Sequence, residues 1–367
     1  MQYPVEPPMS QTAFGYNSVM PNSQDIQYMV SDNAPRVLMV GLKRSGKTSI
    51  LNTVFRQHSP NESLYLDGSA RVERHYLQSI PSIALIDVPG SLDLDELSES
   101  ENTLIFSGNV TIVFVIDAMA NDRIRSHSIF RLCTIAKKAL DINSAIGIEV
   151  LIHKLDSQTI QFKTQIQRMF EMYVQDEDYE SNLSDTHVSY HVTSIFNCSI
   201  HIALSKIIQK LVPQAATFES LLSSFLAKSE SHQVYLVDLT SRLYFAKDNV
   251  ALDPDFYELV IHYNDLMEEI MKQQRRDIRG SPGASSSTGL VEMDDGLVLS
   301  YIAVSPLIGI FNVFSSTSMT RFPIIEYNLQ SLRKSLVETL DYQDQQLDAH
   351  LNRFRTRHPM SPRSSAS

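Results

Sequence analysis

The chain has 367 residues, of which 43% are hydrophobic and 20% charged, a composition typical of a soluble globular protein with room for two domains. Its formal net charge of −11 argues against a nucleic-acid backbone as the main ligand, and its two cysteines are too few for a disulfide framework or a zinc site. No apolar run approaches the roughly 20 residues that a membrane span requires, and neither end matches a secretion or lipidation signal, so we expect a cytoplasmic protein without direct membrane insertion.

The first part of the chain predicts a disordered segment followed by an α/β domain. Residues 1–34 mix Pro, Gln, Asn, Ser and Tyr without apolar periodicity, which is typical of disorder. From there, β-branched apolar runs alternate with segments long enough for crossover helices. The runs predicted as buried strands are 36–41, 82–88, 110–117, 146–153 and 188–194. This alternation predicts a mostly parallel sheet covered by helices on both sides, over residues 35–212.

The pattern changes after Pro213, where a second, α+β domain is predicted over residues 215–345. Helices are expected at 218–228, 257–274 and 325–340, two strands within 232–248, further strands within 296–316, and a flexible loop at 280–289. The last residues, 346–367, are rich in Ser, Arg and Pro and are predicted to be disordered.

The strongest motif is GLKRSGKT, residues 41–48, which matches the P-loop pattern G-x-x-x-x-G-K-S/T between a predicted strand and a predicted helix. Glycines let such a loop fold closely around phosphates, so that its N–H groups and the helix N-terminus face the negative charge. We expect Lys47 to reach the β- and γ-phosphates and the Thr48 hydroxyl to bind Mg²⁺. The residues predicted to surround the phosphates are Gly41, Lys43, Arg44, Ser45, Gly46, Lys47, Thr48 and Ser49.

A second motif, Asp87-Val88-Pro89-Gly90, closes the next strong strand. Alone, D-x-x-G at a strand end is weak evidence because Asp and Gly are common turn residues. The sequence separation between the P-loop and Asp87 leaves room for one helix and one edge strand. This spacing favours Asp87 as the carboxylate beside the magnesium ion. Gly90 is then expected to contact the γ-phosphate.

Two further motifs predict recognition of guanine. LIHKLD, residues 151–156, resembles the N-K-x-D box with His153 in place of Asn. Asp156 has the acceptors for two guanine protons that adenine does not offer, and Lys154 can lie along the base. Ser194 and Ile195, in the segment TSI after the last strand, are expected beside the guanine oxygen. In the alternative interpretation, Asp156 and Ser194 only cap the helices that follow them.

Together these residues resemble a Rag GTPase, and within that family the Rag C/D (fungal Gtr2-type) subclass. The matching segments are 36–50, HSPNESLYL (58–66), IDVPGS (86–91), HKLD (153–156), TSIFNCSI (193–200) and KIIQKLVPQ (206–214). The resemblance covers about residues 35–345 and implies a Ras-like G domain followed by a roadblock-like dimerisation domain. It also implies that Ser69 stands near the switch I position that binds Mg²⁺, together with Thr48 and Asp87.

The resemblance implies a guanine-nucleotide switch that uses GTP, GDP and Mg²⁺. Its implied partners are a Rag A/B-type subunit, a scaffold at the lysosomal or vacuolar surface, the TOR kinase complex and a GTPase-activating protein. Such a pair relays amino-acid availability to TOR. Ser91 stands where related proteins carry a Gln that orients attacking water, so GTP hydrolysis is expected to be slow or partner-dependent.

Two other functions remain open from the sequence. The first is a scaffold subunit of the same heterodimer that binds a nucleotide but does not hydrolyse it. Ser91 favours this function, whereas Lys47 and Thr48 are compatible with either a switch or a scaffold. A P-loop kinase that acts on a small substrate predicts adenine binding and an arginine-rich lid, and no such lid is evident in the sequence.

Overall fold

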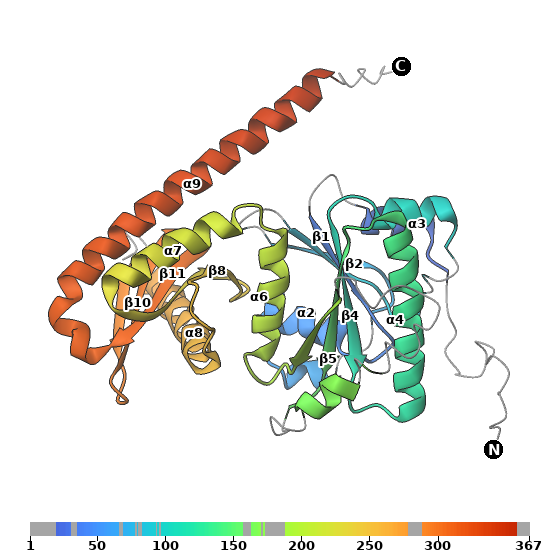
Figure 1. The fold of residues 1–367 in the computed structure, drawn as a ribbon, viewed down its shortest axis with the longest axis horizontal. Helices are drawn as coiled ribbons and strands as arrows, with labels where there is room; N and C mark the ends of the chain where they lie inside the picture. Colours follow the sequence, from blue (N-terminus) through green and yellow to red (C-terminus); the bar gives the residue numbers. More distant parts are fainter. Residues whose placement is uncertain are drawn as a thin grey trace. The chain divides into compact units, whose positions relative to one another are not determined.

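The structure is a computed structural model in which residues 20–30, 35–65, 69–77, 79, 83–92, 94, 97–156, 163–169, 172, 188–277 and 288–357 are described. The chain divides into two compact units, Met1–Leu211 and Val212–Ser367. Each unit has its own sheet (Figure 1).

The first unit is built on a six-stranded, mostly parallel sheet. In spatial order its strands are β2 (Glu73–Leu77), β3 (Ile83–Asp87), β1 (Arg36–Val40), β4 (Val110–Asp117), β5 (Gly147–His153) and β6 (Val188–Thr193). Only β2, at one edge, runs antiparallel to its neighbour. Every residue of β1 and β3 is buried, as expected for parallel strands that are covered on both faces. The predicted mostly parallel α/β fold is confirmed.

Helices cover both faces of this sheet (Figure 1). On one side lie α2 (Lys47–Phe55) and α6 (Ser199–Leu211), and on the other lie α3 (Glu99–Phe106) and α4 (Asp122–Ile142). A short 3₁₀ helix, η2, spans Glu62–Tyr65. Capping explains where two helices begin, because Ser98 forms a capping box with Glu101 and the Asn121 side chain accepts from the backbone N–H of Ile124.

The predicted disorder of residues 1–34 is wrong for one segment, which forms the helix α1 (Ser23–Met29). The Asn22 side chain accepts from the backbone N–H of Gln24 and Asp25, and Asp25 accepts from the Asn22 N–H in return. Ile26 and Met29 are buried in the core of the first unit. So short a helix is stabilised mainly by tertiary contacts, which its polar composition did not reveal.

The second unit is an antiparallel sheet between helices. Its strand order is β8 (Tyr244–Lys247), β7 (Ser231–Asp238), β11 (Ile308–Ser315), β10 (Leu297–Ser305) and β9 (Thr288–Glu292). The helices are α7 (Ala215–Ser229), α8 (Pro254–Asp277) and α9 (Phe322–Arg357), with the 3₁₀ helix η4 (Ser316–Arg321) before α9. All strand pairs are antiparallel, so the predicted α+β class of this part is confirmed.

Aromatic side chains join the helices of the second unit to opposite faces of its sheet. Phe311 packs edge-on against Tyr263 of α8, with ring centroids 6.3 Å apart. Phe314, three positions further along β11 and therefore on the other face, stacks on Phe322 of α9. The helix α7 also packs against α9, which places these two helices on the same side of the sheet (Figure 1).

Two boundaries of the second unit differ from the prediction. The helix α9 continues to Arg357, through residues predicted to be disordered after 345. This stretch is rich in Gln, Leu, Asp and Arg and holds no Gly or Pro before Pro359, so nothing in the sequence interrupts the helix. The strand β9 begins at Thr288, inside the segment predicted as a flexible loop, because it pairs with β10.

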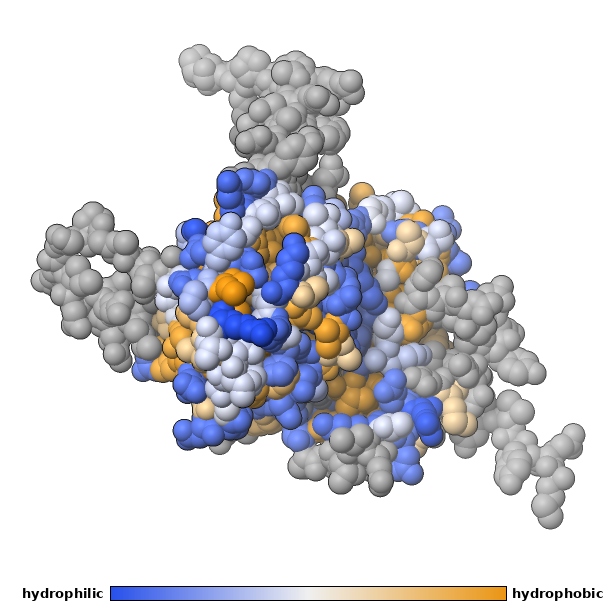
Figure 2. Space-filling view, turned by 60° about the vertical axis from the view of Figure 1, so that its left-hand side comes forward, coloured by the Kyte–Doolittle hydropathy of each residue, from blue (hydrophilic) through white to orange (hydrophobic). Residues whose placement is uncertain are grey.

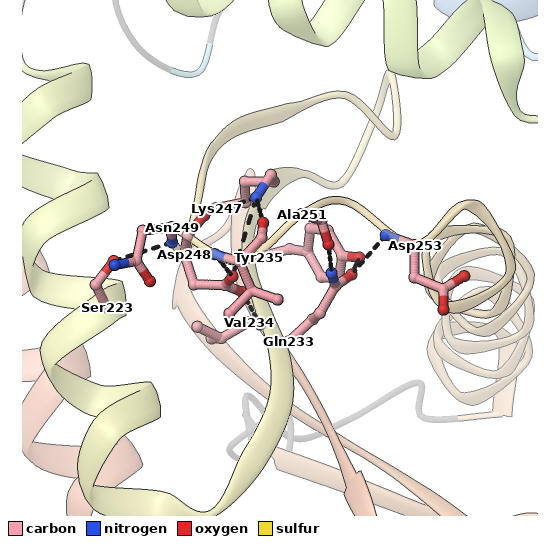
Figure 3. Close-up of polar contacts among 10 residues, drawn as sticks. Ser223, Gln233, Val234, Tyr235, Lys247, Asp248, Asn249, Ala251 and Asp253 are labelled. Atoms are coloured by element: carbon pink, nitrogen blue, oxygen red, sulfur yellow. Dashed lines mark hydrogen bonds and ion pairs between the residues drawn. The ribbon is translucent and has the colours of Figure 1, made fainter.

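A buried carboxylate organises the connection between β8 and α8 (Figure 3). Asp248 accepts from the backbone N–H of Val234 at 2.7 Å with Oδ2 and from that of Val250 at 2.8 Å with Oδ1. Nearby, Gln233 Oε1 accepts from the backbone N–H of Asp253 at 3.3 Å. These bonds satisfy buried polar groups beside the edge strand, so they stabilise the fold and belong to no candidate ligand site.

On the face drawn in Figure 2, hydrophobic residues occur in small groups separated by hydrophilic ones. The large hydrophobic side chains that are at least half exposed are Tyr76, Leu104, Met119, Phe130, Met172, Ile324 and Tyr327. Within the described part of the chain, no helix combines the length and the hydrophobicity needed to cross a membrane.

Candidate nucleotide-binding site

The sequence motifs come together at one edge of the first unit's sheet. The P-loop follows β1, the D-x-x-G motif follows β3, the HKLD motif includes the end of β5, and the TSI segment follows β6. Because β1, β3, β4, β5 and β6 are parallel, their carboxyl ends meet at this edge. Open α/β sheets bind their ligands there.

The first six residues of the P-loop motif, 41–46, take a backbone conformation that depends on glycine at both ends. Gly41 has φ +147° and Gly46 has φ +109°. A Cβ added to Gly41 would lie 2.4 Å from the carbonyl oxygen of Val115, and one added to Gly46 would lie 2.6 Å from the ring of His153. Arg44 also has a positive φ, of 65°. The loop therefore turns tightly and leads directly into the N-terminus of α2, the geometry that suits an anion.

The other predicted phosphate residues lie on this loop or on the first turn of α2. Lys43 and Arg44 are exposed, Ser45 is buried, and Thr48 and Ser49 are partly buried on α2. The buried hydroxyl of Ser45 has no hydrogen-bond partner among the described residues. An orphaned hydroxyl inside a glycine-bounded loop fits a loop whose polar groups are organised for a ligand.

Lys47 is buried and points back into the loop. Its ammonium donates to the carbonyl oxygens of Gly41 at 2.9 Å and Leu42 at 3.0 Å. Burial lowers the pKa of Lys47 to about 8, a shift that the nearby carboxylate of Asp87 opposes and the guanidinium of Arg131 reinforces. At neutral pH the amine is still mostly protonated, so a cation stands inside the phosphate loop.

Three oxygens meet where a magnesium ion is expected. The Thr48 hydroxyl donates to Asp87 Oδ2 at 2.8 Å, the Ser69 hydroxyl donates to the same oxygen at 2.7 Å, and the two hydroxyl oxygens are 2.6 Å apart. The second carboxylate oxygen, Oδ1 of Asp87, is buried without a partner among the described residues. The structure thus brings together Thr48, Ser69 and Asp87, three residues from distant parts of the sequence.

This donor set fits Mg²⁺. The ion prefers oxygen ligands and usually binds through one or two carboxylates together with substrate phosphates, rather than in a cage of acids. Within the described residues, no group of three or more His, Cys, Asp or Glu side chains is arranged for a metal ion. One carboxylate and two hydroxyls would therefore hold Mg²⁺ only with the help of phosphate oxygens.

Gly90 lies directly against the P-loop. A Cβ at this position would come within 2.3 Å of the backbone nitrogen of Lys43 and 2.5 Å of the carbonyl carbon of Leu42. Backbone atoms cannot yield easily to such an overlap, so only glycine allows this approach. The D-x-x-G motif therefore meets the phosphate loop through its glycine as well as through Asp87.

On the predicted guanine side, Lys154 connects two loops. Its ammonium donates to the carbonyl oxygen of Arg44 at 2.7 Å and forms an ion pair of 2.7 Å with Asp117. Lys154 has φ 69°, a left-handed conformation that is uncommon for a residue other than glycine. From this backbone, the lysine side chain reaches from the HKLD motif to the carbonyl of Arg44 in the P-loop.

His153 is buried between the P-loop and the end of β6. Its Nδ1 lies 3.0 Å from Thr193 Oγ1, and its ring fills the space that a side chain on residue 46 would need. Burial lowers the pKa of His153 to about 4, with Lys154 adding to the shift and Asp156 and Asp117 opposing it. The ring is therefore neutral at physiological pH and braces the two loops.

Asp156 and Ser194 meet across the two motifs. Asp156 Oδ1 accepts a hydrogen bond from the Ser194 hydroxyl, and Ser194 Oγ in turn accepts from the backbone N–H of Phe196 at 3.0 Å. The Ser199 hydroxyl, at the start of α6, accepts from the Ser194 backbone N–H at 2.9 Å. Ile195 lies partly buried in the turn that follows Ser194.

Sequence reasoning missed two side chains of this edge. Asp117 ends β4 and pairs with Lys154, and Thr193 ends β6 and contacts His153. A usable signal existed, because both are polar residues at the carboxyl ends of apolar parallel strands. Their partners, however, are far away in the sequence and cannot be read from local patterns.

Comparison with known proteins agrees with this geometry. A model of the Gtr1/RagA G protein conserved region matches residues 36–267. Ras-related GTP-binding protein D from Mus musculus is 32% identical over 312 residues, which cover 84% of this chain and 68% of that protein. GTP-binding protein gtr2 from Schizosaccharomyces pombe is 32% identical over 307 residues, which cover 82% of this chain and 96% of that protein.

A solved roadblock/LC7 domain from Streptomyces avermitilis matches 33% of this chain and 96% of its own, with 18% identity and a TM-score of 0.26. The family match spans more than half of the chain, and the relatives of the Rag C/D and Gtr2 type match along most of it. The chain therefore belongs to the Gtr1/RagA family of G proteins, as a relative of the Rag C/D and Gtr2 members.

Proposed function

We propose that this chain is a guanine-nucleotide-binding switch subunit of a Rag heterodimer. The observation that carries the proposal is the meeting of four motifs at one sheet edge, with Lys47 inside the P-loop and Asp156 bonded to Ser194. Lys47 would neutralise the β- and γ-phosphates, Thr48, Ser69 and Asp87 would hold Mg²⁺, and Asp156 would accept the guanine protons. Mg²⁺, when bound, neutralises phosphate charge.

As a switch, the protein would present different surfaces in its GTP and GDP states. The γ-phosphate would order the segments that contain Ser69 and Gly90, and its loss would release them. Pairing with a Rag A/B-type subunit would occur through the second, roadblock-like unit. A lysosomal or vacuolar scaffold would recruit the pair to the membrane surface, where it would relay amino-acid availability to the TOR kinase complex.

Ser91 favours a second candidate function, a nucleotide-bound scaffold subunit that does not hydrolyse GTP. Ser91 follows Gly90 directly, and its short side chain lacks the reach with which a Gln amide orients attacking water. Slow hydrolysis assisted by a GTPase-activating protein is the form of the switch proposal that is compatible with this residue.

The test is the identity of the nucleotide that co-purifies with the full chain. The chain is co-expressed with a Rag A/B-type partner whose own P-loop lysine is replaced, so that the released ligand reports on this chain. We expect guanine nucleotide from the wild type and none from Lys47→Ala. Asp156→Asn should prefer xanthine nucleotide, because an amide can donate to the extra xanthine oxygen. The matched control is Asp141→Asn, an exposed acid on α4, which should retain guanine.

Adenine nucleotide from the wild type would overturn the proposal in favour of a P-loop kinase, and an empty wild-type protein would contradict nucleotide binding. A single-turnover GTP assay on the same complex, with and without cell extract, then separates the two candidates. Hydrolysis that the extract accelerates supports the switch. The scaffold is supported if GTP stays intact under both conditions.

A further inference from the structure

A buried arginine of α4 contacts the segment that follows the D-x-x-G acid. Arg131 is 8% exposed, and its guanidinium donates from Nη1 to the Gly90 carbonyl oxygen at 3.4 Å and from Nη2 to that of Leu92. The Leu92 backbone N–H donates to the Pro89 carbonyl oxygen at 3.0 Å. Pro89–Leu92 is thus a hydrogen-bonded turn with two of its carbonyls held by one planar group.

These bonds determine the direction of the turn's N–H groups. A trans peptide is planar, so its carbonyl and its N–H point in opposite directions. The Gly90 N–H therefore points away from the Leu92 N–H that binds the Pro89 oxygen, and the Ser91 N–H points away from Arg131. Because Gly90 itself lies against the backbone of Lys43, the orientation of this turn decides what the D-x-x-G motif presents beside the phosphate loop.

Among the described residues, the charge of Arg131 has no acidic partner. No ion pair joins its guanidinium to a described Asp or Glu, and its Nε is buried without a hydrogen-bond partner. A buried, unpaired charge is costly unless a counter-charge enters the region. A terminal phosphate would supply one.

We propose that Arg131 is a positioning residue that holds the turn Pro89–Leu92 in the orientation that contacts the terminal phosphate of GTP. This inference rests on the proposed function and assigns a part to a residue outside the four motifs. GDP lacks the terminal phosphate, so it gains nothing from the orientation of this turn. Loss of Arg131 should weaken binding of GTP more than binding of GDP.

The experiment compares two substitutions in the full chain, paired with the P-loop-substituted partner. Arg131→Gln removes the charge and the planar fork, and Arg131→Lys keeps the charge but can serve only one carbonyl well. Dissociation constants for GTPγS and GDP are measured by displacement of a fluorescent guanine nucleotide. We expect Arg131→Gln to lower the ratio of GTPγS to GDP affinity about tenfold, the effect of one lost charge-assisted contact. Arg131→Lys should give an intermediate ratio.

Lys137→Gln is the matched control, since it removes an exposed positive charge from the same helix and should leave the ratio unchanged. Equal losses of GTPγS and GDP affinity in Arg131→Gln would reveal a merely structural residue and overturn the inference. The inference is also overturned if both Arg131→Lys and Arg131→Gln keep the wild-type ratio of GTPγS to GDP affinity. If Arg131→Gln does not fold, Arg131→Lys decides by the same ratio. A wild-type chain that binds no guanine nucleotide contradicts the proposed function itself, an outcome distinct from an unchanged ratio.

Discussion

At the scale of single residues, His153 shows how one substitution in a motif alters the physics of a site. Its ring lies against Gly46 and contacts Thr193, so it links the P-loop to the end of β6. An Asn, usual at this position of the N-K-x-D box, is smaller and does not titrate. The histidine therefore adds a pH-dependent term to stability that an Asn would not have.

His153→Asn should make the stability of the protein less sensitive to acid. The native pKa of His153 is about 4 and its ordinary value is 6.5, so between these values the unfolded chain binds a proton that the native state does not. Stability is therefore lost as the pH falls through this window, by on the order of 3 kcal/mol for a shift of this size. We expect the asparagine variant to lose less.

The measurement is urea unfolding of the nucleotide-saturated protein at pH 7.0, 6.0, 5.0 and 4.5. Lys154, Asp156 and Asp117 face His153 and remain in both proteins, so their contribution to the pH dependence is shared. His58→Asn, a change at an exposed histidine, is the control and should follow the wild type. Parallel pH profiles for His153→Asn and the wild type would contradict the assignment.

At the scale of elements, α1 is the clearest case of structure created by packing. The helix has seven residues, too few for stability in isolation, yet Met29 is fully buried and Ile26 nearly so. The helix lies against α3 and β2, which flank the D-x-x-G side of the sheet. Arg74 of β2 also donates to the carbonyl of Val30, just after the helix, at 2.8 Å.

Met29→Ala should destabilise the first unit by about 2–5 kcal/mol, the usual cost of truncating a buried methionine. The reason is the cavity left in a core that otherwise excludes water. Met20→Ala, at a residue that is 48% exposed, provides the control and should change stability little. Urea unfolding followed by circular dichroism would measure both variants. If the two substitutions had equal effects, α1 would not be part of the folded core in solution.

At the scale of the whole molecule, the chain forms two units with separate sheets. The first contains the four motifs that are proposed to bind the nucleotide, and the second is an antiparallel sheet with helices on both faces. Each unit buries its own aromatic and aliphatic core, as separate domains do. We therefore expect nucleotide binding in the first unit and pairing with the partner subunit in the second.

A fragment of residues 212–367 should pair with a Rag A/B-type subunit, whereas a fragment of residues 20–211 should not. The expectation follows from the proposal that pairing uses the second unit, and it is independent of the bound nucleotide. Size-exclusion chromatography with light scattering would report the mass of each mixture, with the full chain as the positive control. Pairing by residues 20–211 alone would place the partner surface on the G domain instead.

Local physics explains how much of this protein could be predicted from its sequence. The continuous β-branched strands, the P-loop glycines with their required φ values, and the alternation of strands and helices are local properties, so the sequence alone determined the sheet class and the position of the nucleotide motifs. Only the tertiary structure decided the contacts that no motif or resemblance indicated, because Asp117 reaches Lys154 and Arg131 reaches Gly90 across long stretches of chain. It also decided that α1 is ordered, since burial of Ile26 and Met29 depends on neighbours that no local pattern specifies.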